Sequence, residues 1–233
     1  MEELHMIANA MTKSWEVVKK HWWMMFLMGI PAGIVGAFSD PSMLLKLQGM
    51  QRALFSIFEL IVGLVGILFS ASLAMGYAKS MQTGSFKFKN AFVAFNRKYN
   101  WPVIILVGLL MALAEAFATL LFIVPGVILS VGWGLWMYSY QDNIEAGDEV
   151  GITQAFTDAW KTTKGYKWNF FGLQLLFFCM YMVLTILLTA ITSAFKGNGI
   201  VVAVVSVLVY IPMIIISFWN SAAQIIFYRE IKK

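Results

Sequence analysis

The forty residues WPVIILVGLLMALAEAFATLLFIVPGVILSVGWGLWMYSY, from Trp101 to Tyr140, contain one charged side chain, Glu115. A helix needs about 20 apolar residues to cross roughly 30 Å of hydrocarbon, so this stretch is too long for one span and fits two. The letters IVPG mark the break, because Pro125 disfavours helix in the residue before it and suits the first turn of a new helix. The stretch therefore predicts two membrane-spanning helices joined by a tight turn.

The composition of the whole chain agrees with this interpretation. Of its 233 residues, 60% are hydrophobic and 12% are charged, and the mean hydropathy is +0.76. Soluble domains carry about 25% charged residues, so a single water-soluble domain is excluded. We expect an all-α fold, a polytopic membrane helical bundle in which residues 1–233 form a single transmembrane domain. Six spans are predicted, at about 22–38, 53–78, 101–121, 122–140, 168–195 and 199–227.

The basic residues predict the orientation of these spans. Fourteen of the 17 lysines and arginines fall on one side, in the N-terminal segment, the loops after the second and fourth spans, and the C-terminal tail. The other side has Lys46, Arg52 and Lys196. Because cytoplasmic loops collect positive charge, both termini are predicted to be cytoplasmic. This distribution also explains the net charge of +5 without a nucleic-acid partner.

A short amphipathic segment precedes each odd-numbered span, at about 4–20, 88–98 and 152–164. Each segment has an alanine, a large apolar residue, an aromatic residue one turn later and then lysines, and a tryptophan follows at the membrane surface. A helix with an apolar stripe and a lysine-rich edge is typical of the headgroup plane. Three cytoplasmic interfacial helices and a threefold pseudo-repeat are therefore predicted. The alternative is that loops between membrane helices commonly have this composition, and the sequence leaves both interpretations open.

Two carboxylates, Glu59 and Glu115, lie inside predicted spans. Each is about six residues from the outer end of its span, so both are predicted at one depth, roughly 9 Å below the outer edge of the hydrocarbon. A carboxylate is costly inside a membrane and is by default a candidate functional group. The pair is the candidate intramembrane polar site, and the alternative is that both acids serve helix packing.

Three amides are the second set of polar residues inside the spans. Gln174 in the fifth span is predicted at the depth of Asn220 and Gln224 in the sixth. Asn220 and Gln224 are four residues apart and therefore share one helix face. Interhelical amide hydrogen bonds stabilise bundles in bilayers, so these residues are predicted to make helix–helix polar contacts.

The sequence contains no motif that assigns a reaction, a metal or a cofactor. His5 and His21 have no cysteine or second histidine at ligand spacing, and Cys179 is the single cysteine. The acidic segment QDNIEAGDEV, residues 141–150, lacks the alternation of a calcium loop and is interpreted as solvated. Phosphate loops, zinc helices and serine elbows are also missing from the sequence.

Several letters in the C-terminal half resemble a family of bacterial membrane proteins. These are IVPG at 123–126, QAF at 154–156, KGYKW at 164–168 and AAQIIFYREI at 222–231. They resemble domain-of-unknown-function family nine-seventy-five, a six-span family distantly similar to the membrane domain of some glycerophosphodiester phosphodiesterases. The resemblance implies the bacterial cytoplasmic membrane and no established reaction. Gly151 stands where the family tends to have a serine helix cap.

Two functions are therefore carried forward. The first is a non-enzymatic integral membrane protein, a scaffold or accessory subunit of a membrane complex, whose partners are the lipid bilayer and another membrane protein or a second copy. The second is a small transporter or channel-like carrier that uses Glu59 and Glu115. An intramembrane lipid enzyme would need a nucleophile and a base at one depth, and the sequence does not supply that set.

Overall fold

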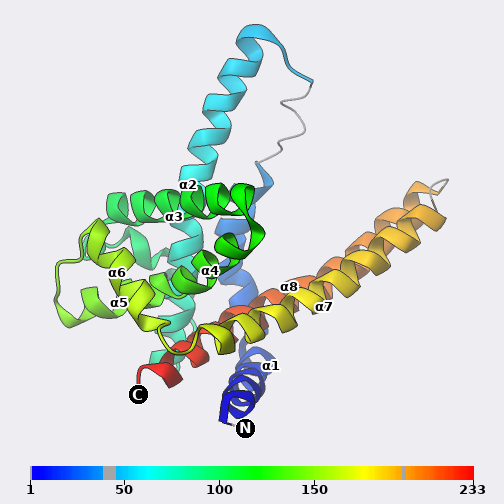
Figure 1. Cartoon of the computed structure of the whole chain (residues 1–233). Helices are drawn as coiled ribbons and strands as arrows, with labels where there is room; N and C mark the ends of the chain where they lie inside the picture. The colour runs from blue at the N-terminus through cyan, green and yellow to red at the C-terminus, as the bar shows by residue number, and fades with distance from the viewer. Residues whose placement is uncertain (1, 39–45, 196–197) are drawn as a thin grey trace. The chain divides into compact units, whose positions relative to one another are not determined.

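The computed structural model describes residues 2–38, 46–195 and 198–233, and these residues form helices with no β-strand among them (Figure 1). Lys196, one of the basic residues assigned to the outer side, lies outside the described residues. The helices in chain order are α1 (Glu2–Ala37), α2 (Gly49–Thr83), the 3-10 helix η2 (Phe88–Phe95), α3 (Trp101–Leu121), α4 (Ile123–Trp133), α5 (Trp136–Ala146), α6 (Ile152–Thr162), α7 (Lys167–Ala194) and α8 (Gly199–Ile231).

Five helical segments are long and apolar enough to cross a membrane, which fits an integral membrane protein. They are Gly49–Thr83, Trp101–Leu121, Ile123–Ala146, Lys167–Ala194 and Gly199–Ile231. The predicted span 22–38 forms the second part of α1 and is not among the five. Its two tryptophans, its proline and its glycines lower its mean hydropathy relative to the leucine- and isoleucine-rich spans.

The described chain divides into two compact units. Unit 1 combines Met1–Trp22 with Gly165–Lys233, and unit 2 is the continuous segment Trp23–Lys164. One boundary therefore falls inside α1, and the other falls beside Gly165, whose φ of 87° is favourable for glycine. The sequence analysis treats the whole chain as one transmembrane domain, whereas the contacts group its two ends together and its middle separately.

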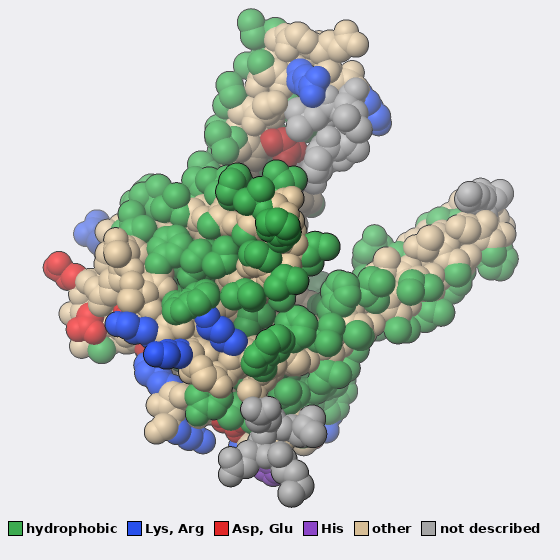
Figure 2. Space-filling model, in the orientation of Figure 1, with side chains coloured by type: hydrophobic (Ala, Val, Ile, Leu, Met, Phe, Trp, Pro, Cys, Tyr) green, Lys and Arg blue, Asp and Glu red, His purple; other side chains and the backbone are tan. Residues whose placement is uncertain are grey.

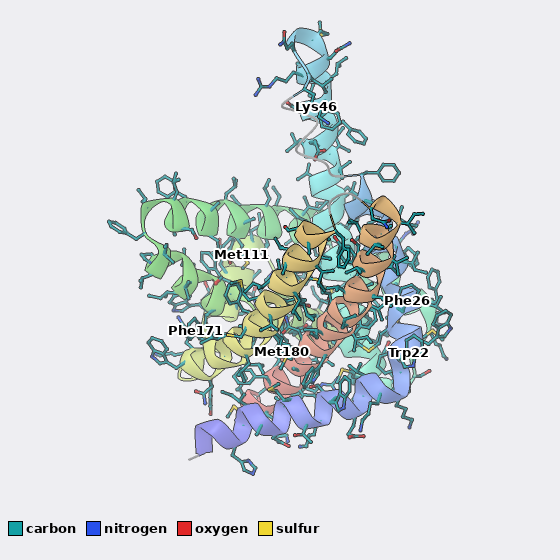
Figure 3. The ribbon with its side chains drawn as sticks, turned by 90° about the vertical axis from the view of Figure 1, so that its right-hand side faces the viewer. Trp22, Phe26, Lys46, Met111, Phe171 and Met180 are labelled. Carbon is teal, nitrogen blue, oxygen red and sulfur yellow. The ribbon has the colours of Figure 1, made fainter. Side chains whose placement is uncertain are left out.

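In unit 1, α7 and α8 lie side by side as an antiparallel hairpin (Figures 1 and 3). The first part of α1 packs against this hairpin. The indole rings of Trp15 and Trp219 lie 5.1 Å apart, and the Trp219 Nε1–H donates to the Met11 carbonyl oxygen at 3.0 Å. The Glu230 carboxylate accepts a hydrogen bond from the Asn9 side chain. Aromatic packing and polar pairing therefore join the beginning of the chain to its last helix.

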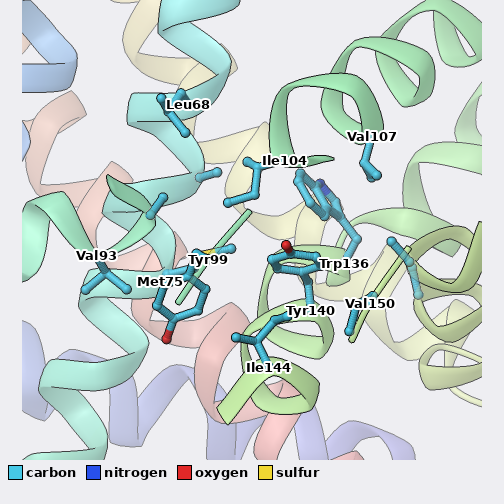
Figure 4. Packing of buried hydrophobic residues seen from close by; sticks show 14 of the residues in the cluster. Leu68, Met75, Val93, Tyr99, Ile104, Val107, Trp136, Tyr140, Ile144 and Val150 are labelled. Atoms are coloured by element: carbon cyan, nitrogen blue, oxygen red, sulfur yellow. The ribbon is translucent and has the colours of Figure 1, made fainter. Parts of the chain in front are cut away.

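In unit 2, η2 packs against the second half of α2. The Ala94 N–H donates to Ser72 Oγ at 3.0 Å, and Asn90 Nδ2 donates to Ser80 Oγ at 2.8 Å. Gly76 allows this close approach, because a Cβ built there would lie 2.1 Å from the Asn90 carbonyl oxygen. The cluster at the core of unit 2 includes Leu68, Met75, Tyr99, Ile104, Trp136 and Tyr140 (Figure 4).

The predicted fourth span is divided into two helices. α4 ends at Trp133 and α5 begins at Trp136, with Gly134 and the fully buried Leu135 between them. Gly132 lies against Trp160 of α6, where a Cβ would meet the indole ring at 2.3 Å. The break follows from glycine's low helix propensity and from packing against α6, which the hydropathy of residues 122–140 does not encode.

The three predicted interfacial helices take different forms. Residues 4–20 continue without interruption into α1, residues 88–98 contain the 3-10 helix η2, and residues 152–164 contain α6. Each places an aromatic ring against a long helix of its own unit: Trp15 against Trp219 of α8, Phe92 against Phe69 of α2, and Trp160 against Trp133 of α4. The alanines that the sequence analysis aligns, Ala10, Ala91 and Ala155, are all buried.

Burial is concentrated at one end of each long helix. In α2 the buried residues run from Leu68 to Ser80, in α7 from Asn169 to Phe177, and in α8 from Phe218 to Tyr228. The opposite halves of these helices carry large exposed apolar side chains, and Figure 2 shows hydrophobic groups spread over the surface. The most apolar windows of α2, α7 and α8 are only 6%, 6% and 0% buried. These halves therefore need an apolar environment outside the described chain.

Candidate functional site

Glu59 lies on the half of α2 in which no described residue is buried. Its side chain is half-buried, and the neighbouring Phe55 and Phe58 rings stack 6.0 Å apart along the same helix. Arg52, seven residues earlier, is exposed. This carboxylate therefore occupies a region of α2 whose surroundings are otherwise apolar.

Glu115 lies in the second half of α3 and is also half-buried. Within residues 2–38, 46–195 and 198–233, its carboxylate makes no hydrogen bond or ion pair. The exposed neighbours Leu113 and Phe117 are 57% and 64% accessible, so the surface around it is apolar.

The structure does not place the two carboxylates beside each other. α2 and α3 approach closely where Ile67 meets Gly108, at which a Cβ would lie 2.5 Å from Ile67 Cγ2. In Figures 1 and 3 α2 stands upright while α3 runs across its direction. Glu59 lies eight residues from this crossing and Glu115 seven residues from it, about 12 Å and about 10 Å along diverging axes. A shared carboxylate site needs parallel axes at this point.

The three amides of unit 1 do meet. Gln174 Nε2 of α7 lies 3.4 Å from Asn220 Oδ1 of α8, and Gln224 Nε2 donates to the same oxygen at 3.2 Å. All three side chains are half-buried. Asn220 Oδ1 is therefore a shared acceptor that links the two helices of the hairpin, as expected for polar contacts between membrane helices.

A polar network in unit 2 was missed by the sequence analysis. Glu145 Oε1 accepts hydrogen bonds from Tyr99 Oη at 2.8 Å and from Gln141 Nε2 at 3.0 Å. Burial, together with this bond to the carboxylate, raises the pKa of the Tyr99 hydroxyl above its ordinary value. Residues 141–146, interpreted as solvated, instead form the end of α5.

Beside this network lies a pocket of about 740 Å³. Its polar lining consists of Lys98, Asn100, Asp148 and Glu149, and Val103, Ile144 and Val150 form its apolar wall. Asn100 and Gly151, which also lines the pocket, are the residues that precede α3 and α6. The spacing of these residues along the chain offered no signal, because loops far apart in sequence form the pocket.

Within the described ranges, no group of three His, Cys, Asp or Glu side chains is arranged to hold a metal ion. No protein-family model, curated protein or solved structure matches the chain. Functional inference therefore depends on its own residues and their arrangement.

Proposed function

We propose that the chain is a non-enzymatic integral protein of the bacterial cytoplasmic membrane that acts as a scaffold or accessory subunit of a membrane complex. One observation carries this proposal, namely that the apolar halves of α2, α7 and α8 are almost entirely unburied. Lipid covers such surfaces, and they are also where a second membrane protein or a second copy of the chain packs. The resemblance of the C-terminal half to a bacterial membrane family agrees with this location.

The proposed topology has six spans with both termini in the cytoplasm. The second part of α1 serves as the first span, and the five longer apolar segments serve as the others. Fourteen of the 17 basic residues lie on the side assigned to the cytoplasm. The buried ends of α2, α7 and α8 lie on that same side, next to the lysine-rich segments.

The proposed architecture also contains three related modules, each with a surface segment and a pair of spans. The burial of Ala10, Ala91 and Ala155 supports it, because these alanines take the same place in the three aligned segments. So does the contact that each segment makes between an aromatic ring and a long helix. Small buried residues let helices approach closely, which gives the three segments a common way of docking.

The second candidate is a small transporter or channel-like carrier using Glu59 and Glu115. Its basis is that each carboxylate lies in an apolar stretch, where an ionisable group is costly. The crossing of α2 and α3 counts against a site shared by the two, so each would have to act alone.

Photo-crosslinking tests the scaffold proposal. A photoreactive amino acid at Ile186 or Val207, each 60% exposed, is compared with one at Phe177 or Ile225, each 1% exposed. In native membranes the exposed positions are expected to give a discrete adduct with one protein, and the buried positions only crosslinks within the chain. Adducts with lipid alone at both exposed positions would contradict the scaffold proposal.

Liposome flux tests the alternative. The purified protein is reconstituted with a pH-sensitive dye inside the vesicles, and Glu59→Gln and Glu115→Gln are compared with the wild type. The scaffold proposal expects no proton or cation flux above that of empty vesicles. Flux that disappears in Glu115→Gln while the protein stays folded would establish the carrier instead.

A further inference from the structure

The pocket beside Lys98 separates positive and negative groups. Lys98 Nζ lies 3.5 Å from the Glu145 carbonyl oxygen, and the pocket faces the starts of α3 and α6 through Asn100 and Gly151. Neither helix start has a side-chain cap or an acidic residue in its first turn. Free N–H groups and the helix dipole make such ends favourable for phosphate. Lys98 and two helix N-termini therefore converge on one side of the pocket.

The opposite charge comes from the end of α5 and the segment that follows it. Ile144 and Gly147 place the C-terminal end of α5, with its partial negative charge, in the lining. Asp148 and Glu149 add two exposed carboxylates. No hydrogen bond or ion pair joins either carboxylate to another residue of the described chain, Lys98 included. The pocket thus presents acceptors for a cation that its own lysine does not satisfy.

The lining also includes an apolar wall, and the pocket adjoins the predicted membrane surface. Val103, Ile144 and Val150 form the wall, and Ile144 and Val150 belong to the core cluster shown in Figure 4. Trp101, next to Asn100, begins the apolar helix α3 and is 52% exposed. Tryptophan at this position is typical of the headgroup level. A volume of about 740 Å³ is in the range of small-ligand sites, roughly 300–1,000 Å³.

We propose that this pocket binds a phosphoethanolamine group, as carried by a zwitterionic aminophospholipid. The phosphate lies against Lys98 and the first turns of α3 and α6. The primary ammonium donates to Asp148, Glu149 and the last carbonyls of α5. The glycerol and first methylenes contact Val103 and Val150. This inference goes beyond the scaffold function and is tested independently of it, in detergent.

Native mass spectrometry of the detergent-solubilised full chain measures the proposed binding. Phosphatidylethanolamine, phosphatidylglycerol and phosphatidylcholine of equal chain length are titrated in turn. Phosphatidylethanolamine is expected to bind most tightly, because only its headgroup combines a phosphate with an ammonium that has three donors. Lys98→Ala should weaken phosphatidylethanolamine and phosphatidylglycerol alike, by about tenfold, as for loss of a charged hydrogen bond. The matched control Lys161→Ala, on exposed α6, should change neither.

The acidic side of the pocket gives a different signature. Asp148→Asn combined with Glu149→Gln should weaken phosphatidylethanolamine by about tenfold and leave phosphatidylglycerol unchanged, because phosphatidylglycerol has no ammonium. Loss of both lipids in this double variant, or equal binding of all three lipids to the wild type, would overturn the proposal.

Gly151→Asp separates loss of binding from loss of folding. Gly151 has φ −82° and ψ 172°, and a Cβ there meets nothing within 4 Å. Aspartate therefore caps α6 without strain and places a carboxylate where the phosphate is expected. The melting temperature should stay the same or rise while phosphatidylethanolamine binding falls about tenfold. Retained binding in this variant would overturn the proposed placement.

Soluble O-phosphoethanolamine distinguishes a lipid from a free compound. If it displaces the lipid only at concentrations far above those of phosphatidylethanolamine, the ligand is the lipid headgroup with its apolar attachment. Displacement at equal concentration, with the same sensitivity to Lys98→Ala, supports the same recognition chemistry and assigns it to a free phosphoethanolamine compound.

Discussion

Gly76 shows how strongly a single atom is constrained in this chain. A Cβ at Gly76 would lie 2.1 Å from the Asn90 carbonyl oxygen, which is backbone and cannot rotate away. Gly76→Ala is therefore expected to separate η2 from α2 and to lower the free energy of unfolding by about 1–3 kcal/mol. The change is measured as a fall in melting temperature in detergent.

Gly63→Ala is the matched control, because it lies in the same helix and its Cβ meets nothing within 4 Å. Alanine has the higher helix propensity, so this variant should be as stable as the wild type or more stable, by up to about 1 kcal/mol. Equal destabilisation by both substitutions would contradict the close contact at Gly76.

Tyr99 connects one residue to the pH dependence of stability. Burial first, and then the hydrogen bond to Glu145, raises its pKa in the folded state. An unfolded tyrosine releases its proton near pH 10, so the contribution of Tyr99 is complete below about pH 10 and is lost as the pH rises further. Tyr99→Phe should lower the melting temperature at pH 7, and its difference from the wild type should narrow above about pH 10.

The exposed Tyr210 is the control for this series, since its side chain is 54% accessible. Tyr210→Phe should leave the melting temperature at pH 7 unchanged. A Tyr99→Phe difference that is constant from pH 7 to pH 11 would show that the Tyr99–Glu145 bond does not couple to the titration.

The sequence identifies some of the polar residues of interest and misses others for one physical reason. Glu59, Glu115 and Asn220 stand out because each is a polar residue in an apolar run. Lys98 and Tyr99 lie among other polar residues, so nothing in the local pattern distinguishes them. Their partners are 46 or 47 residues away along the chain, and only folding brings them together.

The α7–α8 hairpin offers a prediction at the level of elements. Asn220 Oδ1 accepts from both Gln174 and Gln224. Asn220→Ala should therefore destabilise the hairpin more than Gln174→Ala, which leaves the bond within α8 intact. The expected losses are within about 0.6–2 kcal/mol per interhelical bond, measured as melting temperatures of the single and double variants.

Ser221→Ala serves as the control, because the Ser221 hydroxyl donates within its own helix, to the Ser217 carbonyl oxygen at 3.0 Å. It should have little effect. If Gln174→Ala and Asn220→Ala are equally mild, the amides do not hold the two helices together.

The existence of the long helices follows from the sequence, but their geometry does not. Runs of apolar residues predict α2, α3, α7 and α8, because hydropathy depends only on composition and length. The break between α4 and α5 and the crossing of α3 over α2 depend on contacts at Gly132 and Gly108. Such contacts are set by side chains from other helices, so periodicity within one helix carries no record of them.

Topology is the prediction that concerns the whole molecule. In a Cys179→Ser background, a cysteine at Lys46 is expected to react with an impermeant thiol reagent added outside intact cells. A cysteine at Lys89 should react only after permeabilisation, because it lies in the lysine-rich loop assigned to the cytoplasm. Both positions are exposed, so burial does not bias the comparison. The reverse pattern would overturn the proposed orientation.

The composition of unit 1 from both ends of the chain has a consequence for synthesis on the ribosome. Unit 2 is continuous, from Trp23 to Lys164, so all of its contacts become available while later residues are still being translated. Met11 and Trp15, by contrast, emerge first and pair with Trp219, 208 residues later in the case of Met11. The N-terminal helix must therefore wait, without its final partner, until the last span has left the exit tunnel, and a chain truncated before α8 would complete unit 2 but not unit 1.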